Sequence, residues 1–311
     1  MSTHERRSAM GDIKLFDVSG STVLEIDPSA PGLERALQTL IERNLDTFLG
    51  VRFLASEYVT SHGGRMDTLG IDENGCPVII EYKRTRDENV INQGLFYLDW
   101  LMDHRGDFEL LVLKNFGKDA ADQIEWSVPR LLCIAGDFTR YDEHAVKQMG
   151  RNIELIRYRR FGESLLLFDL ITATTAETSV AAPAKRVSST PQTYKTVSEY
   201  LSDADEALTN LYKDVQVQLL ALGDDVQEKT LRFYIAFRRI KNFACVEIKP
   251  QISVVRLYLK VDPDRLELED GFTRDVRQVG HFGTGDLEVT IRNNDDLARA
   301  MPLIRESYEN S

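Results

Sequence analysis

The sequence is poor in residues that cross-link small proteins or anchor them in membranes. Its three cysteines, Cys76, Cys133 and Cys245, are odd in number and form no C-x-x-C pair, so neither a disulfide framework nor a zinc knuckle is indicated. We expect buried core thiols. No stretch approaches the roughly 20 apolar residues of a membrane span, and residues 1–7 lack the apolar core of a signal peptide. These absences predict a cytoplasmic protein without a membrane partner.

Several catalytic motifs are also missing. The chain has no G-x-S-x-G elbow, no H-E-x-x-H pair, no Gly-Lys-Ser/Thr and no G-x-G-x-x-G. The glycine-rich run at residues 280–285 is therefore interpreted as a tight turn before a strand, in which His281 stabilises the turn by a hydrogen bond.

The net charge of −12 argues against a protein that coats nucleic acid indiscriminately, but a local basic track is present. Between residues 229 and 260 the sequence has one acid, Glu247, and these basic residues: Lys229, Arg232, Arg238, Arg239, Lys241, Lys249, Arg256 and Lys260. Aromatic residues are interleaved, a composition that suits phosphate contacts beside stacking surfaces. The alternative is a strand region whose basic residues point outward and whose aromatics form a core.

Composition and length predict two soluble α/β units. Residues 1–171 form the first domain, the Thr-, Ala-, Ser- and Pro-rich residues 172–196 a linker, and residues 197–311 a smaller α+β domain. In the first domain we expect a hairpin at 12–26, helices at 33–49, 87–103 and 142–149, and strands at 53–59, 65–71, 77–83, 108–113, 131–135, 153–158 and 165–170. In the second we expect helix within 197–222 and at 295–308, and strands at 231–237, 244–248, 254–261 and 287–291.

The strands at 65–71 and 77–83 flank an Asn-Gly turn signal at Asn74. A hairpin centred on that turn pairs residues whose numbers sum to 148, which places Asp67 opposite Glu81 and Lys83 on the same face. Two carboxylates are the usual protein ligands of Mg²⁺, the carbonyl of Tyr82 is a further candidate, and a lysine can stabilise phosphate charge or help to deprotonate water. The spacing predicts a Mg²⁺ or Mn²⁺ site for phosphodiester hydrolysis. The alternative is a solvated hairpin face with a surface ion pair.

These residues resemble the PD-(D/E)XK nuclease superfamily, in particular its NucS-like and RecB-like endonucleases. Residues 65–69 resemble the strand with the first acid, and residues 79–84 the strand ending in E-x-K. Gln93 and Tyr97, four residues apart on one helix face, resemble the Q-x-x-x-Y element of the RecB-like branch. The family's proline is absent, since Met66 precedes Asp67.

The resemblance implies a restriction-endonuclease-like core, a mixed sheet flanked by helices, in a metal-dependent DNA endonuclease of DNA repair or of defence against foreign DNA. It implies that Glu34 assists the metal through water, with Glu42 as second choice, and that Gln93 and Tyr97 orient the scaffold or the substrate. As nucleic-acid contacts we predict the following residues: Arg65, Arg84, Arg238, Arg239 and Lys241.

The second domain resembles a domain of unknown function fused behind NucS-like modules, in proteins sometimes labelled predicted transport proteins; the matching residues are 229–237, 280–286 and 303–309. Nothing in the chain supports transport. We expect this domain to bind nucleic acid or to mediate a homodimer. Two alternatives remain open: a catalytically silent nuclease-like module that binds nucleic acid or protein, and a purely structural pair of domains.

Overall fold

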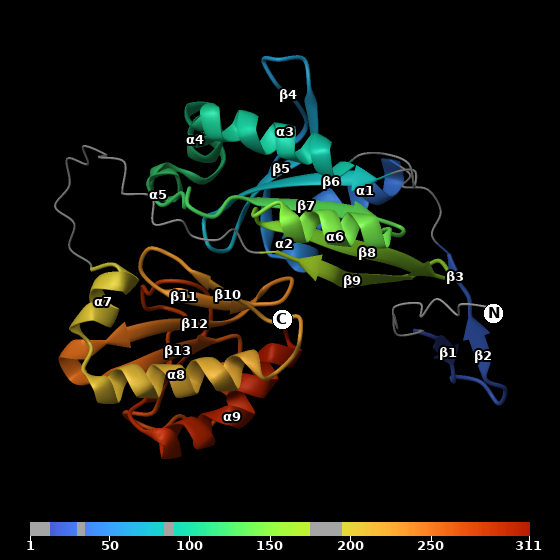
Figure 1. Ribbon diagram of the computed structural model, residues 1–311. Coiled ribbons are helices and arrows are strands. Elements are labelled where there is room, and N and C mark those ends of the chain that lie inside the picture. The colour runs from blue at the N-terminus through green and yellow to red at the C-terminus, as the bar shows by residue number, and fades with distance from the viewer. Residues whose placement is uncertain (1–12, 30–34, 84–89, 175–194) are drawn as a thin grey trace, which may run out of the picture.

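The computed structural model describes residues 13–29, 35–83, 90–174 and 195–311. Within these residues the chain forms two sheet-containing domains and a small N-terminal hairpin (Figure 1). No helix in these ranges is long and apolar enough to cross a membrane. The three cysteines are buried, as predicted.

The N-terminal hairpin and first domain contain these elements: β1 (Leu15–Asp17), β2 (Leu24–Ile26), β3 (Pro28–Ser29), α1 (Arg35–Arg43), α2 (Leu45–Leu49), β4 (Val51–Val59), β5 (Arg65–Asp72), β6 (Pro77–Lys83), α3 (Val90–Asp103), α4 (Arg105–Phe116), α5 (Lys118–Asp122), β7 (Arg130–Ala135), α6 (Arg140–Gln148), β8 (Ile153–Phe161) and β9 (Leu165–Ala173). The predicted hairpin before residue 27 is confirmed. The predicted helix at 33–49 is two helices within the described residues, separated at Asn44.

The first domain is built on one mixed sheet with the strand order β3-β8-β7-β6-β5-β4, to which β9 adds by pairing with β8. β6 pairs antiparallel with β5 and parallel with β7. Successive β6 residues face opposite layers: Ile79 packs in the core of α3 and α4, and Ile80 in the core of α1 and α2. The predicted α/β class, a mixed sheet flanked by helices, is confirmed.

The strand predicted at residues 108–113 is wrong, because this segment lies inside α4. Phe108 and Val112 are buried, whereas Leu110 and Leu113 are 47% and 44% exposed. Residues four apart share one face of a helix, so the apolar run is buried on one side only. The strand that pairs in parallel with β6 is β7. Its continuous apolar run agrees with its burial on both faces.

The second domain contains α7 (Val197–Asp203), α8 (Glu206–Leu220), β10 (Gln227–Thr230), β11 (Ile235–Arg238), β12 (Asn242–Lys249), a 3-10 turn η1 (Pro250–Ile252), β13 (Val254–Leu259), a 3-10 turn η2 (Pro263–Arg265), β14 (Thr273–Asp275), β15 (Leu287–Ile291) and α9 (Asn294–Glu309). The sheet is antiparallel with the order β10-β11-β12-β13-β15-β14. β10 and β14 were not predicted. The linker predicted at 172–196 lies largely outside the described residues, and its first residues complete β9.

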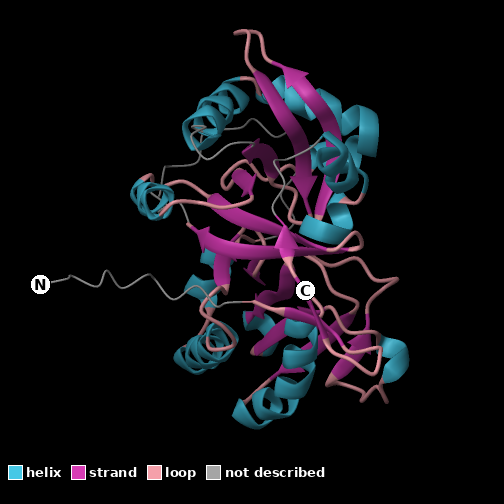
Figure 2. Ribbon diagram, turned by 90° about the vertical axis from the view of Figure 1, so that its right-hand side faces the viewer, coloured by secondary structure: helices cyan, strands magenta, loops and turns pink. Residues whose placement is uncertain are grey.

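The second domain packs against the first with its sheet, while α8 and α9 lie on the far side (Figures 1 and 2). A buried charge cluster joins the two domains. Arg130 donates to Asp72 Oδ2 at 2.8 Å and, through two nitrogens, to both carboxylate oxygens of Glu154 at 2.8 and 2.9 Å. From the second domain, Arg238 approaches Glu154 at 3.4 Å and Asp72 at 3.7 Å. In this cluster the guanidinium groups of Arg130 and Arg238 face the carboxylates of Asp72 and Glu154.

The pKa of Glu154 reflects the positive charges that surround it in this cluster. Burial raises the pKa of a carboxyl group, but the charges of Arg130 and Arg238 outweigh that effect and lower the pKa of Glu154 to about 2. Glu154 is therefore ionised although it is 1% exposed.

The second domain also holds the turn between β5 and β6. Asn74 and Asn242 exchange side-chain hydrogen bonds, and Tyr234 donates to Asn74 Oδ1 at 2.8 Å. Glu73 accepts from Lys260 at 2.8 Å. The β5–β6 hairpin is thus anchored at its tip by residues from far along the chain.

Arg238→Ala is predicted to lower the free energy of unfolding by about 3–5 kcal/mol, because truncating one partner leaves a buried acid without its countercharge. The neighbouring Arg239 pairs with Asp225 at the surface, with side chains 37% and 31% exposed. Arg239→Ala should cost at most about 1 kcal/mol. Urea denaturation of both variants measures the difference, and equal losses would contradict a dominant role for the cluster.

Candidate functional site

The β5–β6 hairpin has the predicted register. Thr68 pairs with Ile80 and Leu69 with Ile79, and each of these pairs sums to 148. The turn is closed by hydrogen bonds from Gly75 N to Asp72 O and from Asp72 N to Cys76 O. The pairing ends at Thr68 and Ile80, and Asp67 and Glu81 are the next residues of the two strands.

The two acids are locked together through the backbone. Asp67 N donates to Glu81 Oε1 at 3.2 Å, and Tyr82 N donates to Asp67 Oδ2 at 3.0 Å. Glu81 is 1% exposed. Burial, and then the charge of Asp67, raise the pKa of Glu81 to about 9. In the absence of a cation, Glu81 therefore holds a proton at neutral pH, because its surroundings do not neutralise a second negative charge beside Asp67.

Glu57 of β4 is a third acid near this pair, and the sequence analysis missed it. Ser56 pairs with Thr68 and Tyr58 with Met66, so Glu57 is level with Asp67 on the next strand. Its charge contributes to the raised pKa of Glu81. Glu57 has a positive φ of 53°, which is strained for a residue with a side chain, and it binds Arg65 at 2.6 Å. β4 and β5 form a second hairpin, and the turn residues Gly63 and Gly64 are the sequence signal for it.

Helix α1 lies against the same end of β5. Gln38 Nε2 lies 3.5 Å from Asp67 O and 3.1 Å from Glu42 Oε1, and Glu42 also accepts from Thr68 Oγ1 at 2.6 Å and from Ser56 Oγ at 2.8 Å. Glu42 is thus committed to neutral donors beside the acid pair. Glu34, the first choice for the assisting acid, lies outside the described residues.

Tyr97 and Gln93 meet the hairpin where β5 begins. Tyr97 OH accepts from Arg65 N and from Gln93 Nε2, each at 3.1 Å. A side chain on Gly64 would have its Cβ 2.6 Å from the Tyr97 ring, so glycine permits this close approach. Tyr97 thus contacts the backbone of β5 two residues before Asp67, and Gln93 is linked to that point through the Tyr97 hydroxyl.

The remaining predicted residues are distributed as follows. Lys83 ends β6 with its backbone paired to Ala135, and Arg84 lies outside the described residues. Arg65 is exposed and remains a predicted nucleic-acid contact. Arg239 pairs with Asp225, and Lys241 donates to Thr47 O of the first domain at 3.2 Å. Both side chains are therefore only partly exposed to solvent.

The prediction that Arg238 contacts nucleic acid is corrected by its burial. Arg238 is 2% exposed, and its guanidinium faces Glu154 and Asp72 and donates to Ile240 O at 2.6 Å. A phosphate cannot reach it in this arrangement. The basic track had the composition of a nucleic-acid surface, but at this position its charge balances buried acids.

The donor set at the hairpin fits a hard divalent cation. Mg²⁺ and Mn²⁺ prefer carboxylate oxygens, and Asp67 and Glu81 place two carboxyl groups side by side, so that a bound cation would displace the proton from Glu81. No cluster of at least three His, Cys, Asp or Glu side chains close enough to hold a metal occurs in the described parts of the chain. Further ligands would come from water, substrate or the Tyr82 carbonyl, as in other magnesium sites that keep several waters.

Comparisons with known proteins give the following matches. Residues 197–311 match the family described as a domain of unknown function (DUF5655). The chain is 26% identical over 306 residues to an uncharacterized protein of Haemophilus influenzae, a match that covers 96% of this chain and 100% of that protein.

Two solved structures share a partial likeness. One is a repair endonuclease from Pyrococcus abyssi, at 19% identity and a TM-score of 0.27, over 40% of this chain and 48% of that one. The other is an EndoMS–dsDNA2 complex, at 19% identity and a TM-score of 0.25, over 42% of this chain and 47% of that one. The match spans less than half of either chain, and TM-scores of this size establish no shared activity.

The raised pKa of Glu81 predicts a pH-dependent stability. Between its ordinary value of 4.5 and about 9, the folded metal-free protein holds a proton at Glu81 that the unfolded chain has released. Stability should therefore fall as pH rises through this window, by up to about 1.4 kcal/mol per pH unit. Glu81→Gln, which cannot ionise, should flatten that slope in urea denaturation with chelator present.

Glu163→Gln is the matched control for this measurement, because Glu163 is exposed in the turn after β8. Its slope should equal that of the unmodified protein. An unchanged slope in Glu81→Gln would show that Glu81 is not the group that titrates.

Proposed function

We propose that the first domain is a Mg²⁺- or Mn²⁺-dependent DNA endonuclease that hydrolyses phosphodiester bonds at the β5–β6 hairpin. The observation that carries this proposal is the backbone-locked pair of Asp67 and Glu81, in which burial and then the charge of Asp67 raise the pKa of Glu81. A carboxyl group whose pKa is raised in this way is a candidate functional group. The partial likeness to repair endonucleases agrees with this reading but does not carry it.

In this proposal Asp67 and Glu81 hold the ion. A divalent ion bound there would supply Lewis-acid stabilisation of charge on the phosphate. Lys83, two residues after Glu81 on β6, would stabilise the same developing charge or take part in deprotonating the attacking water. Glu34, or as second choice Glu42 of α1, would order water near the acids.

Precise placement of the acids would come from both ends of the hairpin. Tyr97 fixes the start of β5 through Arg65 N, and the second domain fixes the turn through Asn74 and Glu73. A positional error of about 1 Å is enough to cost a large factor in rate, so a hairpin anchored at both ends suits catalysis. Gln93 supports Tyr97 by donating to its hydroxyl.

Asp67→Asn and Glu81→Gln should each reduce metal-dependent DNA cleavage by more than the about 10- to 100-fold typical of groups that only orient a ligand. Both replacements preserve side-chain shape, so circular dichroism and melting temperature should show a folded protein. The assay is cleavage of labelled single-stranded, duplex, flapped and mismatched oligonucleotides with Mg²⁺, with Mn²⁺ and with chelator.

Glu163→Gln serves again as control and should cleave like the unmodified protein. Full activity in both acid variants, or cleavage that persists in chelator, would refute the proposal. Absence of cleavage under all conditions, with no heat on Mn²⁺ titration, would instead favour the silent binding module.

A further inference from the structure

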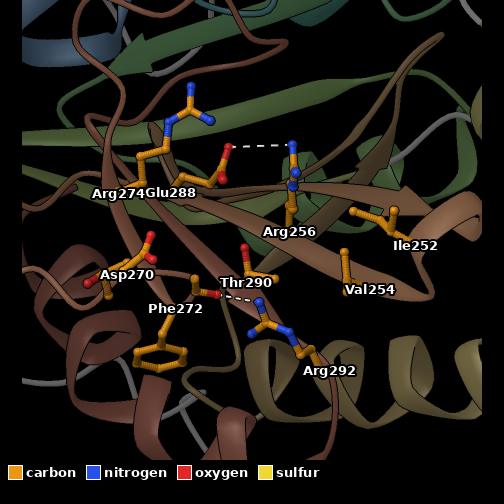
Figure 3. Close-up of a pocket in the computed structure, with 11 residues that line it drawn as sticks. Ile252, Val254, Arg256, Asp270, Phe272, Arg274, Glu288, Thr290 and Arg292 are labelled. Atoms are coloured by element: carbon orange, nitrogen blue, oxygen red, sulfur yellow. Dashed lines mark hydrogen bonds and ion pairs between the residues drawn. The ribbon is translucent and has the colours of Figure 1, made fainter.

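The sheet face of the second domain that points away from α8 and α9 is covered only in part by the first domain. Ala236 and Cys245, on β11 and β12, pack with Cys76 and Val128 of the first domain. Toward β13, β15 and β14, the same domain holds a pocket of about 390 Å³ (Figure 3). Neither the acid pair nor the domain interface accounts for this pocket.

Strand register assembles three arginines around the pocket. Arg256 of β13 is paired with Thr290 of β15, and Arg274 of β14 with Glu288 of β15. Arg292 follows Thr290 by two positions. Side chains two apart on a strand share a face, so these cations come together although they lie far apart in the sequence. Figure 3 shows Glu288 between Arg256 and Arg274.

The guanidinium groups retain unused hydrogen-bonding capacity. Arg256 Nη1 lies 3.7 Å from Glu288 Oε2, an ion-pair distance too long for a hydrogen bond, and its buried Nε has no hydrogen-bond partner among the described residues. Arg292 donates to Gly271 O through Nη2, and its Nη1 lies 3.7 Å from Asp296 Oδ2, again too far for a hydrogen bond. Arg274 is exposed, and its side chain forms no hydrogen bond or ion pair with the described residues. Buried hydrogen-bond donors usually have an acceptor. A ligand that binds in the pocket would supply one for Arg256 Nε.

We propose that this pocket binds a phosphate group, carried either by a free nucleotide or by a strand of nucleic acid. Its lining includes the three arginines and two acids, Asp270 and Glu288, of which Glu288 is 6% exposed and faces Arg256. Arginine is suited to phosphate because its planar fork donates two hydrogen bonds to a pair of oxygens.

The size and walls of the pocket fit the rest of such a ligand. A volume of about 390 Å³ lies in the range of small-molecule sites. Ile252, 57% exposed, and Val254 form an apolar wall beside the arginines, where a base or sugar could lie. The inference does not depend on cleavage in the first domain, because it rests on residues of the second domain alone.

The test is isothermal titration of the full chain with inorganic phosphate, with deoxyadenosine monophosphate and with a short oligothymidylate. Chelator is present throughout, so that no metal-dependent binding at the acid pair contributes. Arg274→Ala and Arg292→Ala should each weaken binding about 10- to 100-fold, the factor expected for the loss of a charge-assisted hydrogen bond. Arg305→Ala, which removes an exposed arginine of α9 outside the pocket, is the matched control and should bind normally.

Binding of the mononucleotide with this variant pattern supports a free nucleotide as ligand, and binding of the oligonucleotide alone with the same pattern supports a strand. The proposal is overturned if the unmodified chain binds none of the three probes. It is equally overturned if Arg274→Ala and Arg292→Ala bind normally, or if Arg305→Ala loses as much affinity, since that would indicate unspecific attraction. Melting temperatures confirm that each variant is folded.

Discussion

The buried ion cluster around Arg130 is the interaction on which the arrangement of this molecule depends. Arg130, Asp72 and Glu154 come from three strands of the first sheet, and Arg238 reaches them from the second domain. Removing charges from water is costly, and the cost is offset only where each charge meets partners at close range. The two domains must therefore meet in register, and the turn that begins at Asp72 is fixed as a result.

Two buried glutamates of the first domain have opposite electrostatic character. Glu154 of β8 lies in the charge cluster beside the hairpin turn, where the arginines lower its pKa to about 2, so this acid is ionised and structural. At the other end of the hairpin, burial and Asp67 raise the pKa of Glu81 to about 9. Both glutamates are 1% exposed, so burial alone does not explain the difference. The sign of the neighbouring charge does, and it separates an acid that holds the fold from one suited to hold a cation.

The basic track of the second domain does not form the single exposed surface that its composition suggested. Arg238 is buried, Lys229 is 6% exposed and donates to Asn152, and Lys241 contacts the first domain. Much of that track therefore forms the interface, as strand residues that face the neighbouring domain. Of the cations around the pocket, Arg256 lies on β13, Arg274 on β14, and Arg292 directly follows β15; only Arg256 belonged to the predicted track.

The sequence by itself determined the hairpin, since the Asn-Gly turn and two-residue alternation are local properties of the backbone, and these bring Asp67 and Glu81 to the same end of the hairpin. It misled at residues 108–113, where a continuous apolar run did not distinguish a strand from a helix buried on one face. Only the tertiary structure decided that Arg238 is an interface cation, that Glu57 lies level with Asp67, and that Glu81 is protonated near neutral pH. Solvation and charge pairing depend on neighbours distant in the sequence, which no local pattern records.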